Sequence, residues 1–251
     1  KTKEGVLSII NFAENEWASA TNNTAGANPM SVIENANQIK EAKKKADFVL
    51  VIIHGGHEYY NLPSPKMQQQ YRFYADQGAD VIVGHHTHCI SGFEEYNGVP
   101  IYYSLGNFLF TNRSNFDDWF TGLVLEIKII NKKIISILHP IKQERESFAL
   151  KLLVKNEKKI VLNRILGFNK IISKNDKLLN EWNNFIDDKD QSYLNYWSPL
   201  SFIRNRYLKT VFRKLGIKAI NKKGLALKLN LIRCESHLDI SKKILQKYLK
   251  K

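Results

Sequence analysis

Residues 79–88 read ADVIVGHHTH, a short apolar run followed by three histidines within four positions. A continuous run of β-branched residues is typical of a strand buried on both faces, as in the middle of a parallel sheet. The whole chain holds only seven histidines, and histidine is the commonest metal ligand in proteins. The stretch therefore predicts a buried strand that ends either in part of a metal site or in a polar turn. The positions of other candidate ligands must decide between the two.

A second buried strand precedes this one in the sequence. Residues 48–54 read FVLVIIH, and residues 64–78 between the two strands have helix length and end in a glycine. A strand–helix–strand unit of this kind makes its two strands parallel and adjacent or nearly so. Since parallel strands end at the same edge of a sheet, we expect His54 beside His85–His88.

The flanking segments extend the same α/β pattern. Residues 6–12 (VLSIINF) favour another strand, and the signals at Pro29 and Ser31 predict a helix that runs to about Lys45. The Asn97-Gly98 pair predicts a hairpin between residues 91–96 and 99–105. Residues 123–130 and 133–140 favour a second hairpin around 131–133.

One edge of the predicted sheet thus gathers most of the candidate ligands. They are His54, His57, Glu58, His85, His86, His88 and Asn107, joined by Glu14 and Asn15 if strand 6–12 is also parallel. So many nitrogen and oxygen ligands at one edge favour a metal site over a polar turn. The motif HGGHE (54–58) matches no helical zinc motif, and its glycines indicate a close backbone approach instead. We count Glu58, Tyr59, Asn107, Glu14 and Asn15 as candidate substrate-binding residues.

Composition excludes several other classes of protein. The 251 residues are 43% hydrophobic, enough for a sizeable core, and no apolar run approaches the length of a membrane span. Two cysteines, Cys89 and Cys234, exclude a disulfide-dense scaffold and a thiolate zinc cluster. Cys89 follows His88 directly and should point to the opposite face of the strand, so we expect a buried, inert thiol.

The positive charge lies almost entirely in the second half of the chain. Residues 1–140 hold 12 Lys/Arg against 14 Asp/Glu, whereas residues 141–251 hold 26 against 10. We expect residues 143–251 to form a basic, mainly helical appendage, which either binds an anionic polymer or only presents a solvated surface. Nothing in this half matches a nucleic-acid module. The candidate cationic face is Arg204, Arg206, Lys209, Arg213, Lys214 and Lys218, beside the apolar stripe Phe202, Tyr207, Leu208, Val211, Phe212 and Leu215.

Three segments resemble one known family. HGGHEYYNLPSP, GADVIVGHHTH and YNGVPIYYSLGNFLF, with NLIRCESH more weakly, are similar to the CapA family of capsule and poly-γ-glutamate biosynthesis proteins. That family belongs to the calcineurin-like metallophosphoesterase superfamily. The resemblance implies an α/β/β/α sandwich over residues 1–142, as the C-terminal part of such a domain, with two divalent metal ions at the strand ends. The resemblance also suggests association with the cell envelope, and a cytoplasmic location is the alternative.

The resemblance also implies roles for the histidines. By similarity, His54 and His86 would share one metal ion of the Mn, Fe or Zn class and His88 would reach the other. Because GHHTH is one residue longer than the superfamily pattern, His85 is an alternative to His86. The superfamily's early Asp-x-His, Gly-Asp and Gly-Asn-His motifs do not occur here, since Gly106-Asn107 is followed by Phe108. The sequence begins KTKEGV, without an initiator Met or signal peptide, so we expect those motifs to precede Lys1.

Two functions follow from this resemblance. The first is metal-dependent hydrolysis of a phosphoester by the full-length protein, which the residues present here should not perform alone. The second is a non-catalytic module that binds or exports an anionic envelope polymer through the basic half. Nucleic-acid binding through that half ranks below both, because basic charge alone is unspecific.

Overall fold

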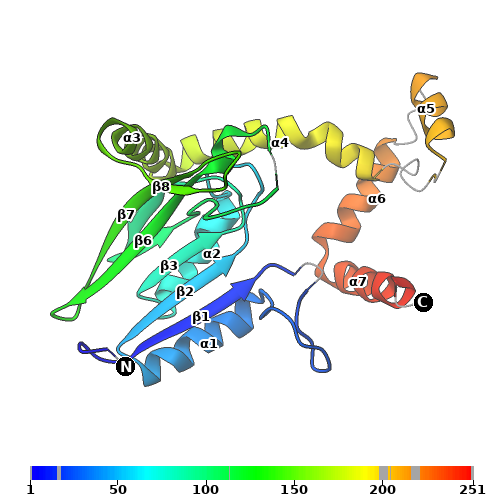
Figure 1. Cartoon of the computed structure of the whole chain (residues 1–251). Helices are drawn as coiled ribbons and strands as arrows, with labels where there is room; N and C mark the ends of the chain where they lie inside the picture. The colour runs from blue at the N-terminus through cyan, green and yellow to red at the C-terminus, as the bar shows by residue number, and fades with distance from the viewer. Residues whose placement is uncertain are drawn as a thin grey trace. The chain divides into compact units, whose positions relative to one another are not determined.

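The computed structural model describes residues 2–15, 18–112, 114–197, 203, 205–215 and 221–249 (Figure 1). The side chains of residues 195, 197, 209, 213, 235, 239, 243 and 246–249 are also outside the description. The chain divides into two compact units, residues 1–183 and residues 184–251.

The first unit is built on a five-stranded sheet with the order β1-β2-β3-β5-β4. Its strands are β1 (Leu7–Ala13), β2 (Phe48–His54), β3 (Val81–His85), β4 (Phe93–Tyr96) and β5 (Val99–Tyr102). β1, β2, β3 and β5 are parallel, and β4 pairs antiparallel with β5. The predicted parallel crossover is confirmed, and so is the parallel placement of the first strand.

Two helices connect the parallel strands. α1 (Val32–Lys45) follows Ser31, and α2 (Pro65–Asp76) begins after Ser64, whose hydroxyl accepts a hydrogen bond from the Met67 amide at 3.2 Å. Both starts are where serine and proline signals predict them. α1 contacts β1 and β2, and α2 contacts β3 and β5, so the helices cover one face of the sheet.

A second, three-stranded antiparallel sheet has the order β6-β7-β8, with β6 (Thr121–Ile130), β7 (Lys133–Gln143) and β8 (Leu150–Leu152). The short 3-10 helix η1 (Asp117–Phe120) leads into β6. The β6–β7 turn has only two residues, Asn131 and Lys132, both with positive φ (50° and 58°). The expectation of a helical pattern from residue 143 onward is wrong for β8. That strand forms because it pairs with the end of β7, an interaction that local sequence does not encode.

The two sheets share one hydrophobic core. Val81 and Val83 of β3 pack in a cluster with Leu123 of β6 and with Ile165 of α3 (Lys155–Ile172). Figure 1 shows the green strands β6 and β7 lying over the cyan and blue strands of the first sheet. The α/β class is therefore confirmed, with a helix layer, a parallel sheet and an antiparallel sheet in succession.

The basic half begins inside the first unit and continues into the second. α3 contacts β4 and β7, so it belongs to the body of the first unit. The second unit contains most of α4 (Asn175–Trp197) together with α5 (Arg206–Lys214), α6 (Lys222–Arg233) and α7 (Glu235–Leu249). The domain boundary at 142/143 stays a prediction. Among the described residues, none of the helices has the length and apolar character needed to cross a bilayer.

Candidate metal centre

Three strand ends meet at one edge of the parallel sheet. Ala13 of β1 pairs with His54 of β2, and His54 pairs with His85 of β3. Backbone hydrogen bonds continue past the strands, from the Glu14 amide to the His54 carbonyl at 2.9 Å and from the Gly55 amide to the His85 carbonyl at 3.1 Å. The predicted convergence of the histidines at this edge is therefore what the fold produces.

His54 and His86 lie in direct contact. His86 Nδ1 is 3.1 Å from His54 Nε2, and the two rings meet edge to face with centroids 4.8 Å apart. Two imidazole nitrogens bound to one tetrahedral zinc ion at their usual bond lengths would lie about 3.3 Å apart. The spacing of this pair therefore fits two ligands of a single metal ion.

The backbone at His86 is held in a conformation that histidine rarely adopts. Its φ is 101°, and that of His88 is 58°. Positive φ in a residue with a Cβ costs roughly 1–3 kcal/mol and is often found where a fold positions functional side chains. The strained backbone of the turn at residues 86–88 thus sets the direction in which the side chains of His86 and His88 point.

His88 is oriented by Asn107. The Asn107 amide nitrogen donates to the Trp119 carbonyl at 3.0 Å, so its Oδ1 faces His88 Nδ1 at 2.9 Å as an acceptor. The neutral form of His88 would then carry its proton on Nδ1 and leave Nε2 available to bind a metal. His88 also stacks on Trp119 at 4.5 Å between ring centroids and lies 6.0 Å from the His86 ring. Asn107 thus positions His88, and its predicted role in substrate binding stays a prediction.

His85 and His57 have more buried surroundings. Burial, and then the charge of His54, lower the pKa of His85, while burial, and then the charge of His86, lower the pKa of His57. Both rings are therefore neutral at physiological pH, as a metal ligand must be. The His57 ring lies against Trp182 with centroids 4.7 Å apart.

Among the described residues, no set of three or more His, Cys, Asp or Glu side chains is arranged to hold a metal ion. The structure does bring together the rings of His54, His86 and His88 as predicted, with centroids 4.8 Å apart for His54 and His86 and 6.0 Å apart for His86 and His88. Their role as ligands, and the choice between His85 and His86, stay predictions.

The acidic candidates lie at the same edge with different contacts. Glu14 Oε1 accepts from the Gly56 amide at 3.0 Å, and its side chain occupies the space that a Cβ on Gly55 would need, at 2.8 Å. Asn15 donates to the Met30 carbonyl at 2.9 Å and holds the loop after β1. Glu58 is exposed, with Oε1 3.8 Å from His88 Nε2. Glu58 thus approaches His88.

Aromatic side chains line the site beside His88, and sequence reasoning missed most of them. Tyr59 is 42% exposed and stacks on Trp119 with centroids 6.1 Å apart, while Phe110 meets His88 edge to face at 5.0 Å. The Tyr59 amide donates to the Thr87 carbonyl at 2.9 Å, and this hydrogen bond holds Tyr59 at its positive φ of 63°. The loop from 107 to 120 carried no signal except its density of aromatic residues.

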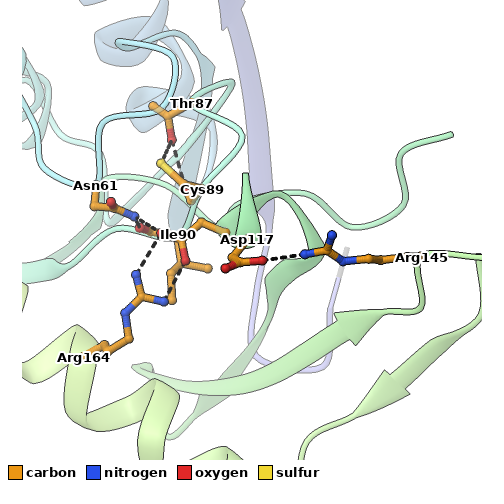
Figure 2. Close-up of polar contacts among 8 residues, drawn as sticks. Asn61, Thr87, Cys89, Ile90, Asp117, Arg145 and Arg164 are labelled. Carbon is orange, nitrogen blue, oxygen red and sulfur yellow. Dashed lines mark hydrogen bonds and ion pairs between the residues drawn. The ribbon is translucent and has the colours of Figure 1, made fainter. Parts of the chain in front are cut away.

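A partly buried ion pair supports this loop, and it was also missed. Arg164 of α3 binds Asp118 through both terminal nitrogens, at 2.7 and 2.8 Å. Asn61 donates to Asp118 at 2.9 Å and to the Ile90 carbonyl at 2.8 Å. Figure 2 shows the Asn61 amide and the Arg164 guanidinium converging near Ile90. These hydrogen bonds join α3 to the segments around Asn61 and Asp118, which lie on either side of the candidate site.

Cys89 is buried as expected, with its sulfur 3.5 Å from the Thr87 hydroxyl (Figure 2). Burial raises the pKa of its thiol to about 12, so almost no thiolate exists at neutral pH. We expect iodoacetamide at pH 8 to alkylate the partly exposed Cys234 of the folded protein and to leave Cys89 unmodified. Peptide mass spectrometry measures this, and comparable modification of both cysteines would contradict it.

Comparisons with known proteins place the match on the segment that carries this site. Residues 5–112 match the family model for the bacterial capsule synthesis protein PGA_cap. The chain is 48% identical over 91 residues to the PGA biosynthesis protein CapA of Bacillus subtilis, which is 36% of this chain and 24% of that relative. It is 44% identical over 84 residues to the capsule biosynthesis protein CapA of Bacillus anthracis, 33% of this chain and 20% of that relative.

A third relative, the uncharacterized protein y4sH of Sinorhizobium fredii, is 36% identical over 90 residues, which cover 35% of this chain and 19% of y4sH. The matches to the three relatives thus span between 19% and 24% of their lengths. Residues 5–112 of the chain are thus similar to bacterial capsule synthesis proteins of the CapA type.

Proposed function

We propose that this protein acts in the biosynthesis of a capsule or poly-γ-glutamate polymer, as a metal-dependent hydrolase of the phosphoesterase type. The observation that carries the proposal is the contact of His54 and His86, at 3.1 Å, at the carboxyl edge of a parallel sheet. The succession of helix layer, parallel sheet and antiparallel sheet supports a calcineurin-like metallophosphoesterase sandwich.

The residues of the edge suit such a reaction in distinct ways. His54 and His86 would hold one divalent ion of the Mn, Fe or Zn class, and His88, fixed by Asn107, would direct Nε2 toward a second. Bound ions of this class supply Lewis-acid stabilisation of a phosphoryl group and a nucleophile at neutral pH. Glu58 and Tyr59, exposed beside His88, are the side chains placed to contact a substrate.

Metal affinity tests the proposal. We expect His86→Ala to weaken zinc or manganese binding by at least about tenfold, because it removes one of two converging nitrogens. His237→Ala is the matched control, since His237 is exposed on α7 outside this edge. Competition with a chromophoric chelator measures both affinities, and equal affinity of the parent and His86→Ala would contradict the proposal.

A second candidate function is a non-catalytic module that binds or exports an anionic envelope polymer. The excess of 26 cationic over 10 anionic residues in 141–251 favours it. Of the predicted cationic face, Arg206 and Lys214 are exposed. Arg204, Lys218 and Phe202 lie outside the described residues, as do the side chains of Lys209 and Arg213.

Two measurements separate these functions. Chelator-sensitive turnover of an aryl phosphate by the full-length protein, lost in His86→Ala, supports the hydrolase. Salt-dependent binding of poly-γ-glutamate without such turnover supports the module, since attraction between charges fades over a Debye length of about 8 Å at physiological ionic strength.

A further inference from the structure

Helix α5 carries its apolar residues on one face. Asn205 begins the helix by accepting hydrogen bonds from the Tyr207 and Leu208 amides, at 2.9 and 3.3 Å. Residues spaced by three and four positions share one face of a helix. The apolar residues that follow this spacing are Tyr207, Leu208, Val211, Phe212 and Leu215. Lys214 lies at the edge of this stripe, seven residues after Tyr207, and Arg206 lies off the stripe with its guanidinium 5.1 Å from the Tyr207 ring centroid.

The apolar face of α5 is open to solvent. Tyr207, Leu208, Val211 and Leu215 keep 70%, 51%, 50% and 68% of their surface exposed. No described hydrophobic residue beyond Leu178 is buried, so the helices of the second unit form no hydrophobic core among the residues that the structure describes. Contiguous exposed apolar surface of this kind marks a surface that binds something else.

The charge of the surrounding sequence indicates which kind of partner binds this face. Residues 191–234 contain ten Lys and Arg and no Asp or Glu. A soluble polyanion would account for the cations but not for a row of exposed apolar side chains. A membrane with anionic headgroups accounts for both the cations and the exposed apolar side chains. The cations pair with lipid phosphates, and the apolar face enters the boundary between headgroups and acyl chains.

We propose that α5 is an interfacial helix that binds the surface of an anionic lipid membrane, with Leu208, Val211 and Leu215 inserted and with Arg206 and Lys214 at the headgroups. The inference is independent of the hydrolase and rests on residues away from the histidine edge. It places the chain at a lipid surface without any membrane-crossing segment within the residues described.

Vesicle sedimentation of the 251-residue chain tests the proposal. We expect strong binding to phosphatidylcholine vesicles that contain phosphatidylglycerol, and about tenfold weaker binding to pure phosphatidylcholine. The double variant Leu208→Gln/Val211→Gln keeps every charge and should lose about tenfold in affinity for the anionic vesicles, because it removes apolar burial alone. Arg206→Gln/Lys214→Gln should also bind more weakly.

The matched control is Leu166→Gln/Leu179→Gln, which removes two leucines that are 54% and 49% exposed in the first unit. It should bind like the parent. Circular dichroism establishes that helix content is retained, and Leu215→Gln alone provides a second test of the apolar face should the double variant lose helix.

Three results would overturn the proposal. Equal vesicle binding by the parent, Leu208→Gln/Val211→Gln and Leu215→Gln would mean that charge alone drives binding to the vesicles. A parent that ignores vesicles but binds poly-γ-glutamate would assign the basic half to the polymer. A parent that ignores vesicles and forms a dimer, dissociated by Leu208→Gln/Val211→Gln, would make the apolar face a contact between copies.

Discussion

Gly84→Ala should destabilise the protein by about 3 kcal/mol or more, the largest effect that we expect from a single methyl group. Gly84 lies in β3, and a Cβ there would sit 2.2 Å from the Tyr103 carbonyl oxygen and 2.9 Å from its carbon. Both are backbone atoms, so no side-chain rotation relieves the clash. The segment directly after β5 must move away, and the hydrogen bond from the Leu105 amide to the Gly84 carbonyl at 3.2 Å is disturbed with it.

Urea denaturation measures the loss, with Gly167→Ala as the matched control. Gly167 lies inside α3 and has nothing within 4 Å of its would-be Cβ. The same substitution there should raise stability by up to about 1 kcal/mol, because alanine favours the helix. Because Gly84 directly precedes His85 and His86, its replacement should also weaken metal binding. Similar stabilities of the two variants would contradict the close approach at Gly84.

The sequence predicted the parts of this fold that local pattern and chain topology determine. The apolar runs at 48–54 and 81–85 with a helix between them required parallel strands, and parallel strands required His54 to meet the 85–88 turn. The Asn97-Gly98 turn is likewise local, because its positive φ values of 51° and 80° suit those two residues.

What could not be predicted depends on partners distant in sequence. β8 has three residues and exists through its pairing with Ile141–Gln143. The role of Asn107 in orienting His88 needs the Trp119 carbonyl, which only the folded loop supplies. The backbone strain at His86 could not be predicted from the sequence either, because a φ of 101° goes against the local backbone preference of histidine.

Arg164→Ala should destabilise the protein by about 1–2 kcal/mol, a value discounted because the Arg164 side chain is 39% exposed. Asp118 is only 13% exposed in its side chain and would keep Asn61 as its remaining described hydrogen-bond donor. A carboxylate left without its counter-ion in partly buried surroundings bears most of the loss. Because Asn61 and Asp118 flank the Tyr59–Trp119 stack in the sequence, the aromatic side of the site should loosen as well.

The neighbouring pair supplies the control for Arg164→Ala. Arg145 binds Asp117, one residue before Asp118 (Figure 2), but the two side chains are 52% and 91% exposed. Arg145→Ala removes the same type of group from water-exposed surroundings and from the face of the Phe120 ring. We expect it to cost under about 1 kcal/mol. Equal losses in the two variants would mean that burial contributes nothing at Asp118.

The pH dependence of the Arg164→Ala effect provides a sharper measurement. Burial alone would raise the pKa of Asp118, but hydrogen bonds from Arg164 and Asn61, with the Arg164 charge, outweigh it and hold that pKa below its usual value of 3.8. A carboxyl whose pKa is lower in the folded state stabilises the protein above its unfolded pKa, and this contribution is lost as pH falls through the folded value. The stability difference between the parent and Arg164→Ala should therefore be constant from about pH 5 to 8 and shrink below about pH 4. A difference that grew on acidification would mean that the Asp118 carboxylate is not the group that Arg164 stabilises.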